Sequence, residues 1–162
     1  MAINGHHSAS AQTDIWLTPP EIIKDLGPFD LDPCAAENSP CDTAKTHYTE
    51  NGLLLPWHGF VWCNPPYTRE LIGAFMQRCA MHNNGLAMTF ARTETEWFFA
   101  YVWPVATAIL FVEGRIHFYK PDGTRAKGNC GGPSVIIAYG SDARSRLKAS
   151  SVKGKFIELK HT

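Results

Sequence analysis

Phe60-Val-Trp-Cys-Asn-Pro-Pro-Tyr67 is the stretch of this 162-residue chain that best indicates its fold. Phe60 to Cys63 are apolar or aromatic, which is typical of a strand covered on both faces. Pro66 restricts the residue before it to an extended conformation, so a helix can begin only after Tyr67. The stretch predicts a stiff loop at the carboxyl end of a buried strand, where open α/β sheets bind ligands. Its amide oxygen, proline carbonyl and flat ring together suit a planar amine.

The segments around this stretch alternate between helical and strand patterns. Thr18-Pro-Pro-Glu21 predicts a helix start with Thr18 as N-cap and Pro19 as the first helical residue, and Gly27-Pro28 predicts its end. Apolar residues at helical spacing over 68–82 predict a second helix, which 83–85 end. An aromatic helix is expected through about residue 103, a turn at 113–114 and a hairpin segment over 115–119. Strands are expected over 29–32, 60–63, 86–91, 106–112 and 134–139.

This order of elements indicates an α/β fold. We expect a mostly parallel sheet covered by helices on both faces, with a C-terminal antiparallel hairpin. The loops after Asp32, Cys63 and Ala91 should lie along one edge, where a cofactor would bind. The length predicts one domain, over 14–162, after a flexible polar N-terminus over 1–13.

Composition narrows the class of protein. A hydrophobic content of 44% and a charged content of 19% are ordinary for a soluble globular protein. The N-terminus lacks an apolar leader, and the longest apolar run, 97–112, is too short to cross a membrane. Five cysteines without a C-x-x-C pair argue against a disulfide framework and a zinc site, and they predict a reducing, cytoplasmic location.

Charge is distributed unevenly along the chain. The net charge is zero, but residues 1–112 carry a net −6 and residues 113–162 a net +6. A basic C-terminal third is compatible with a surface that meets phosphates. An ordinary solvated surface would explain the same count equally well.

The Asn-Pro-Pro-Tyr loop suits chemistry on the exocyclic amine of a base such as adenine. The lone pair of this amine is delocalised into the ring, which makes it a poor nucleophile. Two acceptors for its two N–H groups, the Asn64 side-chain oxygen and the Pro65 carbonyl, would free the lone pair for attack. Tyr67 could stack on the base once it has left the helix. An ordinary turn, which Asn and Pro also favour, is the competing interpretation.

Two other motifs fit a nucleotide-like cofactor. Phe29-Asp-Leu-Asp-Pro-Cys-Ala35 places a carboxylate at a strand end, where it could hold amino or hydroxyl groups. It is not the G-x-G-x-x-G dinucleotide fingerprint, and alone it would more often be a strand end with a helix cap. Trp16-Leu-Thr-Pro-Pro-Glu21 is locally an ordinary helix start, although such a start can also hold a carboxylate.

Taken in order, these motifs resemble the phage-type DNA N6-adenine methyltransferases, the phage Dam-like family, which use S-adenosylmethionine. The resemblance covers residues 14–140. Besides the three motifs above, it rests on Gly52-Leu53 with Trp57, Ala91-Arg-Thr-Glu-Thr95, Gly114-Arg-Ile-His-Phe118 and Pro133-Ser134.

The resemblance implies an adenine-specific DNA methyltransferase with the gamma order of motifs and a Rossmann-like fold shorter than the full seven-stranded form. It implies DNA as partner, S-adenosylmethionine as cofactor, no metal, and a phage or prophage origin with a role related to restriction and modification. The implied catalytic residues are Asn64, Pro65, Pro66 and Tyr67. The implied cofactor-binding residues are Trp16, Thr18, Pro19, Asp30, Asp32, Pro33, Cys34 and Ala35. The implied candidates for DNA contacts are Arg69, Arg92, Thr93, Thr95 and Arg115.

The sequence also departs from the family pattern. Only about thirty residues separate Asp32 from Asn64, too few for two full βα units. The acidic residue that grips the ribose is therefore unassigned; Glu50 could serve, or Glu50-Asn-Gly52 could be only a turn. A separate target-recognition domain does not fit.

Two alternatives to DNA methylation remain open from the sequence. The same loop could methylate a protein glutamine or an RNA adenine. A shrunken fold could also bind S-adenosylmethionine or DNA without turnover.

Overall fold

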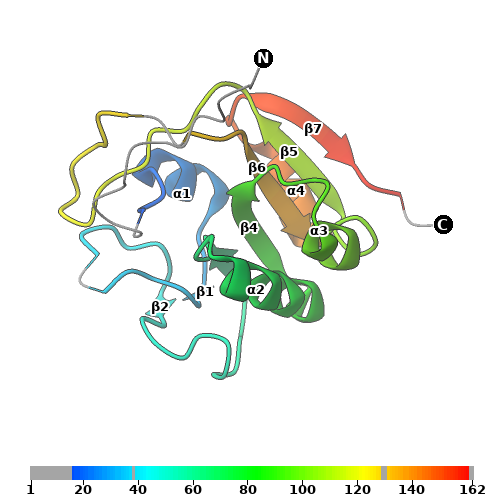
Figure 1. Ribbon diagram of the computed structural model, residues 1–162, viewed down its shortest axis with the longest axis horizontal. Helices are drawn as coiled ribbons and strands as arrows, with labels where there is room; N and C mark the ends of the chain where they lie inside the picture. Colours follow the sequence, from blue (N-terminus) through cyan, green and yellow to red (C-terminus); the bar gives the residue numbers. More distant parts are fainter. Residues whose placement is uncertain (1–15, 38, 129–130, 161–162) are drawn as a thin grey trace, which may run out of the picture.

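A mixed seven-stranded sheet runs through the protein (Figure 1), which we describe from a computed structural model covering residues 16–37, 39–128 and 131–160. The predicted flexible N-terminus, 1–13, lies outside these residues. The strands are β1 (Leu31–Asp32), β2 (Thr46–His47), β3 (Val61–Cys63), β4 (Gly85–Phe90), β5 (Ala108–Val112), β6 (Ser134–Tyr139) and β7 (Gly154–Glu158). They are ordered β2-β1-β3-β4-β6-β5-β7 across the sheet.

The sheet has a parallel half and an antiparallel half. β2, β1, β3 and β4 pair in parallel, whereas β4, β6, β5 and β7 pair antiparallel. The prediction of an α/β fold with antiparallel strands toward the C-terminus is confirmed. The sheet is more mixed than expected, because three of its six strand pairings are antiparallel.

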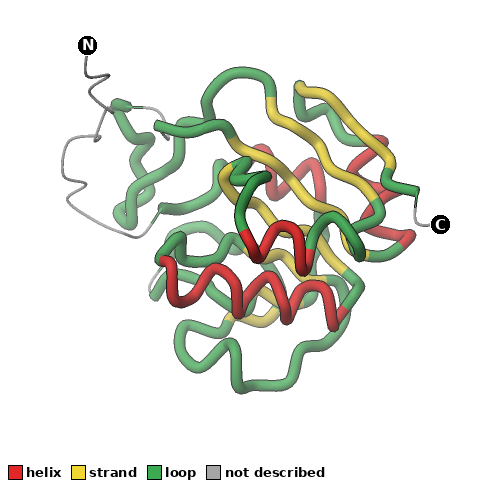
Figure 2. Tube along the Cα trace, turned by 45° about the vertical axis from the view of Figure 1, so that its right-hand side comes forward, coloured by secondary structure: helices red, strands yellow, loops and turns green. Residues whose placement is uncertain are grey.

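Within the described residues, four helices cover the two faces of the sheet (Figure 2): α1 (Pro20–Leu26), α2 (Arg69–His82), α3 (Glu96–Tyr101) and α4 (Ser141–Ala149). Helices α1 and α4 pack on one face, where Leu26 and Leu147 join Trp62 and Met88 in one hydrophobic cluster. Helices α2 and α3 supply the cluster on the other face. Buried strands therefore need apolar residues on both sides, as in β4, where only Phe90 is partly exposed.

The start of α1 differs from the prediction. The helix begins at Pro20, and Pro19 takes the N-cap position without a side-chain capping bond. Thr18 is therefore not the N-cap, and its hydroxyl instead accepts a hydrogen bond from Asn64. The predicted end at Gly27 is confirmed.

The largest differences between the structure and the sequence prediction lie at the two ends of the sheet. The sheet is not shortened in strand number, since β2 and β7, which were not predicted, bring the total to seven. Helix α4 was also missed, and 115–119 is not a strand, although Tyr119 forms isolated bridges with Leu17 and Arg125. The predicted lack of space between β1 and β3 is confirmed: the described residues between them contain only the two-residue β2 and no helix.

Candidate functional site

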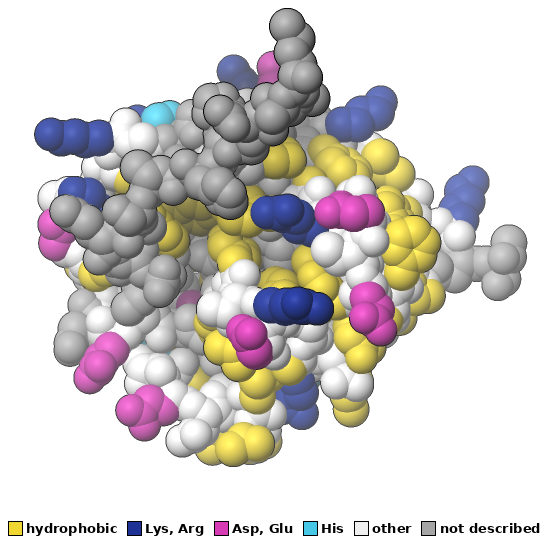
Figure 3. All heavy atoms as spheres, in the orientation of Figure 1, with side chains coloured by type: hydrophobic (Ala, Val, Ile, Leu, Met, Phe, Trp, Pro, Cys, Tyr) yellow, Lys and Arg dark blue, Asp and Glu magenta, His cyan; other side chains and the backbone are white. Residues whose placement is uncertain are grey.

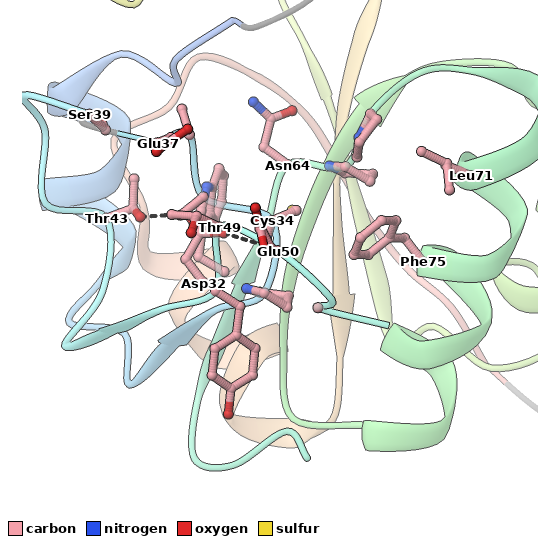
Figure 4. Close-up of a pocket in the computed structure, with 18 of the residues that line it drawn as sticks. Asp32, Cys34, Glu37, Ser39, Thr43, Thr49, Glu50, Asn64, Leu71 and Phe75 are labelled. Atoms are coloured by element: carbon pink, nitrogen blue, oxygen red, sulfur yellow. Dashed lines mark hydrogen bonds between the residues drawn. The ribbon is translucent and has the colours of Figure 1, made fainter. Parts of the chain in front are cut away.

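A cavity of about 640 Å³ opens at the carboxyl ends of β1, β2 and β3 (Figure 4). The loops after these strands form much of its wall, and the segment before α1 and the first turns of α2 complete it. Because parallel strands end at the same edge, motifs that lie far apart in the sequence meet here. The predicted residues that line this cavity are Trp16, Thr18, Asp32, Pro33, Cys34, Ala35, Asn64, Pro65, Pro66 and Tyr67.

The orientation of the Asn64 side chain is set by the segment before α1. Its Nδ2 donates to the Trp16 carbonyl at 3.1 Å and to the Thr18 hydroxyl at 3.3 Å. A backbone carbonyl can only accept a hydrogen bond, so the nitrogen must face Trp16 and Oδ1 must face the other way. The hydroxyl of Tyr67 donates to this Oδ1 at 2.9 Å. Asn64 therefore offers an acceptor, not a donor, on the side of Tyr67.

Tyr67 forms part of the boundary between two hollows. Its ring packs against Phe90 with centroids 4.6 Å apart and planes tilted by 38°. It lines both the cavity that holds Asn64 and a second groove of about 820 Å³ between α2 and α3. The Tyr67 ring thus contacts Phe90, and its hydroxyl donates to Asn64.

Asp32 holds the cofactor-side loop together. Its carboxylate accepts hydrogen bonds from the Cys34 backbone N–H at 3.0 Å and from the Thr43 hydroxyl (Figure 4). The side chain is almost fully buried, and this burial raises the pKa of Asp32 although both hydrogen bonds act in the opposite direction. Asp32 thus stabilises the turn over 33–35 as well as facing the cavity.

Two predicted cofactor residues lie elsewhere. Asp30 does not line the cavity; it forms a salt bridge with Lys45 at 2.8 Å and accepts the Phe60 N–H. The hydrogen bond from Lys45, followed by that from Phe60, lowers the pKa of Asp30. Pro19 is buried at the start of α1 and is also absent from the cavity wall.

The segment after β2 contributes residues that sequence reasoning did not assign. Glu50, which remained a candidate for the ribose, lines the cavity three residues after the end of β2 (Figure 4). Gly52 lies so close to the loop after β1 that an added Cβ would stand 1.7 Å from the Pro33 carbonyl oxygen. The pair Gly52-Leu53 was visible in the sequence, but its place in the site depends on β2, which is too short to recognise.

The groove between α2 and α3 collects three of the five predicted DNA contacts. Arg69, Arg92 and Thr95 line it together with Tyr67 and Phe90. Figure 3 shows two basic groups on either side of a hollow on this face of the molecule. The guanidinium groups of Arg69 and Arg92, which line the groove, form no ion pair or hydrogen bond with another described residue.

The other two predicted DNA contacts lie outside both hollows. Thr93 contributes its carbonyl to Trp103, and Arg115 is exposed in the loop after β5.

The described part of the chain holds no group of three or more histidine, cysteine or acidic side chains that could bind a metal ion. Among the same residues, no helix has the length and apolar character needed to cross a membrane.

Comparison with known proteins identifies relatives of the chain. Residues 5–155 match the model of a family described as DNA N-6-adenine-methyltransferase (Dam). A protein of Escherichia phage T1, named DNA N-6-adenine-methyltransferase, is 37% identical over 106 residues. The alignment covers 58% of this chain and 43% of the phage protein, so the chain matches less than half of that relative's length. No solved structure matches the chain.

Proposed function

Because the chain belongs to the DNA N-6-adenine-methyltransferase (Dam) family, we propose that it transfers a methyl group from S-adenosylmethionine to the N6 amine of adenine in DNA. The observation that carries the proposal is the orientation of Asn64. Its Nδ2 is bound by the segment before α1, so its Oδ1 is presented beside Pro65 at the carboxyl end of β3.

The cavity beside Asn64 has a composition that fits S-adenosylmethionine. A volume of about 640 Å³ lies within the usual range of small-molecule sites. Asp32 and Glu50 supply carboxylates suited to amino and hydroxyl groups, and Leu53 and Phe75 supply apolar wall. When bound, the cofactor supplies an electrophilic methyl group on a sulfonium. The loop over 33–35, fixed by Asp32, would hold it together with Glu50.

The protein's own contribution is to orient and activate the amine. Oδ1 of Asn64 and the carbonyl of Pro65 each accept one N6–H, which localises the nitrogen lone pair for attack. A carbonyl oxygen has two lone pairs, so Oδ1 can accept the amine while it keeps the bond from Tyr67. The rings of Tyr67 and Phe90 offer apolar surface for a base that has left the duplex.

The groove between α2 and α3 is the proposed path of the DNA. Tyr67 and Phe90 line it, and so do Arg69 and Arg92, whose guanidinium groups form no ion pair or hydrogen bond with another described residue. Arginines in such positions can bind backbone phosphates and fix the register of a strand.

Methyl transfer from labelled S-adenosylmethionine tests the proposal. Duplex DNA, RNA and protein would be offered together, and the labelled product would be digested and identified. We expect label in N6-methyladenine from DNA, its loss in Asn64→Ala, and its retention in Asn84→Ala. Asn84 is a matched control because it lies before the amino end of β4, at the opposite edge of the sheet. Label in glutamine or in RNA alone would contradict the proposal.

A further inference from the structure

The Thr18 hydroxyl contacts Asn64 of the catalytic loop, and neither the family match nor the proposed mechanism gives this hydroxyl a role. We propose that Thr18 is a positioning residue for methyl transfer, whose hydroxyl helps to orient the Asn64 amide. With the Trp16 carbonyl, it keeps Oδ1 of Asn64 available to the target amine. This inference rests on the proposed function, because it assigns a role in that reaction.

The two ends of the Asn64 amide have opposite hydrogen-bonding roles. One end of an asparagine side chain accepts hydrogen bonds and the other donates them, and the two ends have nearly the same shape. If the Asn64 amide rotated by half a turn, it would present N–H groups to an amine that itself must donate. Binding Nδ2 on the far side prevents this rotation. Thr18 and Trp16 supply the two acceptors that do so.

Thr18 is rigid enough for this task. Its side chain is almost fully buried, and the residue before it, Leu17, exchanges two backbone hydrogen bonds of 2.9 Å with Tyr119. Pro19 and Pro20 restrict the backbone that follows. The hydroxyl does not cap α1, since that helix has no side-chain cap. The position of its oxygen is therefore fixed, and the Trp16 carbonyl, which can only accept, decides which end of the Asn64 amide faces this segment.

Thr18 also lines the cofactor cavity, so the experiment must separate orientation of Asn64 from cofactor binding. Thr18→Val replaces the hydroxyl with a methyl group of similar size, and Thr18→Ser keeps the hydroxyl. Cofactor affinity would be measured by titration calorimetry, and methyl transfer in a single turnover at saturating cofactor and DNA. Thr46→Val, on β2 and outside both hollows, controls for the exchange of threonine for valine.

We expect Thr18→Val to lower the single-turnover rate by roughly tenfold to a hundredfold, as a small misplacement of a reacting group does. Its cofactor dissociation constant should change less than about threefold, the size of a weak hydrogen bond. Thr18→Ser should restore the rate to within about threefold of wild type, since it keeps the same acceptor. If Thr18→Val does not fold, Thr18→Ala removes the same hydroxyl without adding a methyl group.

A second readout does not depend on activity. In ¹⁵N NMR spectra, the side-chain NH₂ of Asn64, assigned by its disappearance in Asn64→Asp, should exchange slowly with solvent in wild type. It should exchange faster in Thr18→Val and remain slow in Thr46→Val.

Three results would overturn the inference. One is a rate loss in Thr18→Val that appears only as weaker cofactor binding. Another is an unchanged rate in this variant, and the third is unchanged exchange of the Asn64 NH₂. Failure of wild type to methylate DNA would instead refute the proposed function, and with it any role of Thr18 in that reaction.

Discussion

Replacing Asn64 with aspartate tests the side-chain orientation on which the proposed mechanism depends. Nδ2 donates to the Trp16 carbonyl at 3.1 Å and to the Thr18 hydroxyl at 3.3 Å. A carboxylate has the same shape but places an acceptor where the donor was. The Thr18 hydroxyl can turn and donate to it, whereas the Trp16 carbonyl can only face another oxygen.

The expected effect follows from this one unfavourable contact. A buried acceptor left unsatisfied costs about 1–3 kcal/mol. Because Trp16 and Asn64 are only partly buried, we expect Asn64→Asp to lower the free energy of unfolding by about 1 kcal/mol at pH 8. Repulsion from the Trp16 carbonyl should raise the pKa of the new carboxyl above its unfolded value of about 3.9. At a pH below the unfolded pKa, the carboxyl is protonated in both the folded and the unfolded protein, so this repulsion is absent. The penalty grows as the pH rises through the raised pKa and then becomes constant.

Urea denaturation followed by tryptophan fluorescence between pH 4.5 and pH 8 would measure this penalty. Asn64→Ala removes the same donors without adding a charge, so it should be destabilised without the added pH dependence. If Asn64→Asp is as stable as wild type at pH 8, with the same pH profile, then Nδ2 does not face Trp16 and our account of the site is wrong.

Other parts of the site make separate predictions. Arg69→Ala and Arg92→Ala should each weaken binding to a short DNA duplex and lower the number of counterions released on binding by about one, measured from the salt dependence of the affinity. An equal loss of affinity in Arg115→Ala, outside the groove, would contradict this assignment. Gly52→Ala would place a Cβ 1.7 Å from a loop carbonyl, so calorimetry should show cofactor binding about tenfold weaker, and unchanged affinity would refute the placement of the cavity. Burial raises the pKa of Asp32 above 3.8. In denaturation experiments, wild type should therefore lose stability relative to Asp32→Asn as the pH rises through the raised pKa. The opposite slope would show that the hydrogen bonds to Asp32 favour its ionised form.

The sequence predicts best the elements whose residues are buried on both faces. The structure has β6 over the predicted 134–139, and β4 and α2 each begin within one residue of the prediction. These segments lie between two hydrophobic clusters, so their apolar patterns are continuous and easy to recognise. The amino-acid sequence alone thus indicates the α/β fold class and the edge of the sheet at which the functional site lies.

The elements that were missed depend on tertiary contacts. β7 pairs with β5, yet each of its residues is at least partly exposed, so its sequence lacks the apolar pattern of a buried strand. In α4 only Ala143 and Leu147 are buried, which gives a weak helical pattern. β2 has two residues, and no local pattern can identify so short a strand.

The functional site, like the fold, could be predicted only in part from the sequence. All four residues of the Asn-Pro-Pro-Tyr loop and six of the eight predicted cofactor residues line one cavity. Their meeting could be predicted, because carboxyl ends of parallel strands share an edge. The partners of Asn64 could not be predicted, since they lie 46 and 48 residues earlier in the chain. The same holds for Asp30, which forms a salt bridge with Lys45 and does not line the cavity.

Mass spectrometry of nucleosides from DNA incubated with S-adenosylmethionine and the purified protein tests the central claim most directly. Unmethylated plasmid would be treated with wild type and with Asn64→Ala, then digested completely. We predict N6-methyladenine with wild type and at least a hundredfold less with Asn64→Ala, in line with the loss of a preorganised polar contact to the reacting group. No N6-methyladenine with wild type, or equal amounts with both proteins, would contradict the account.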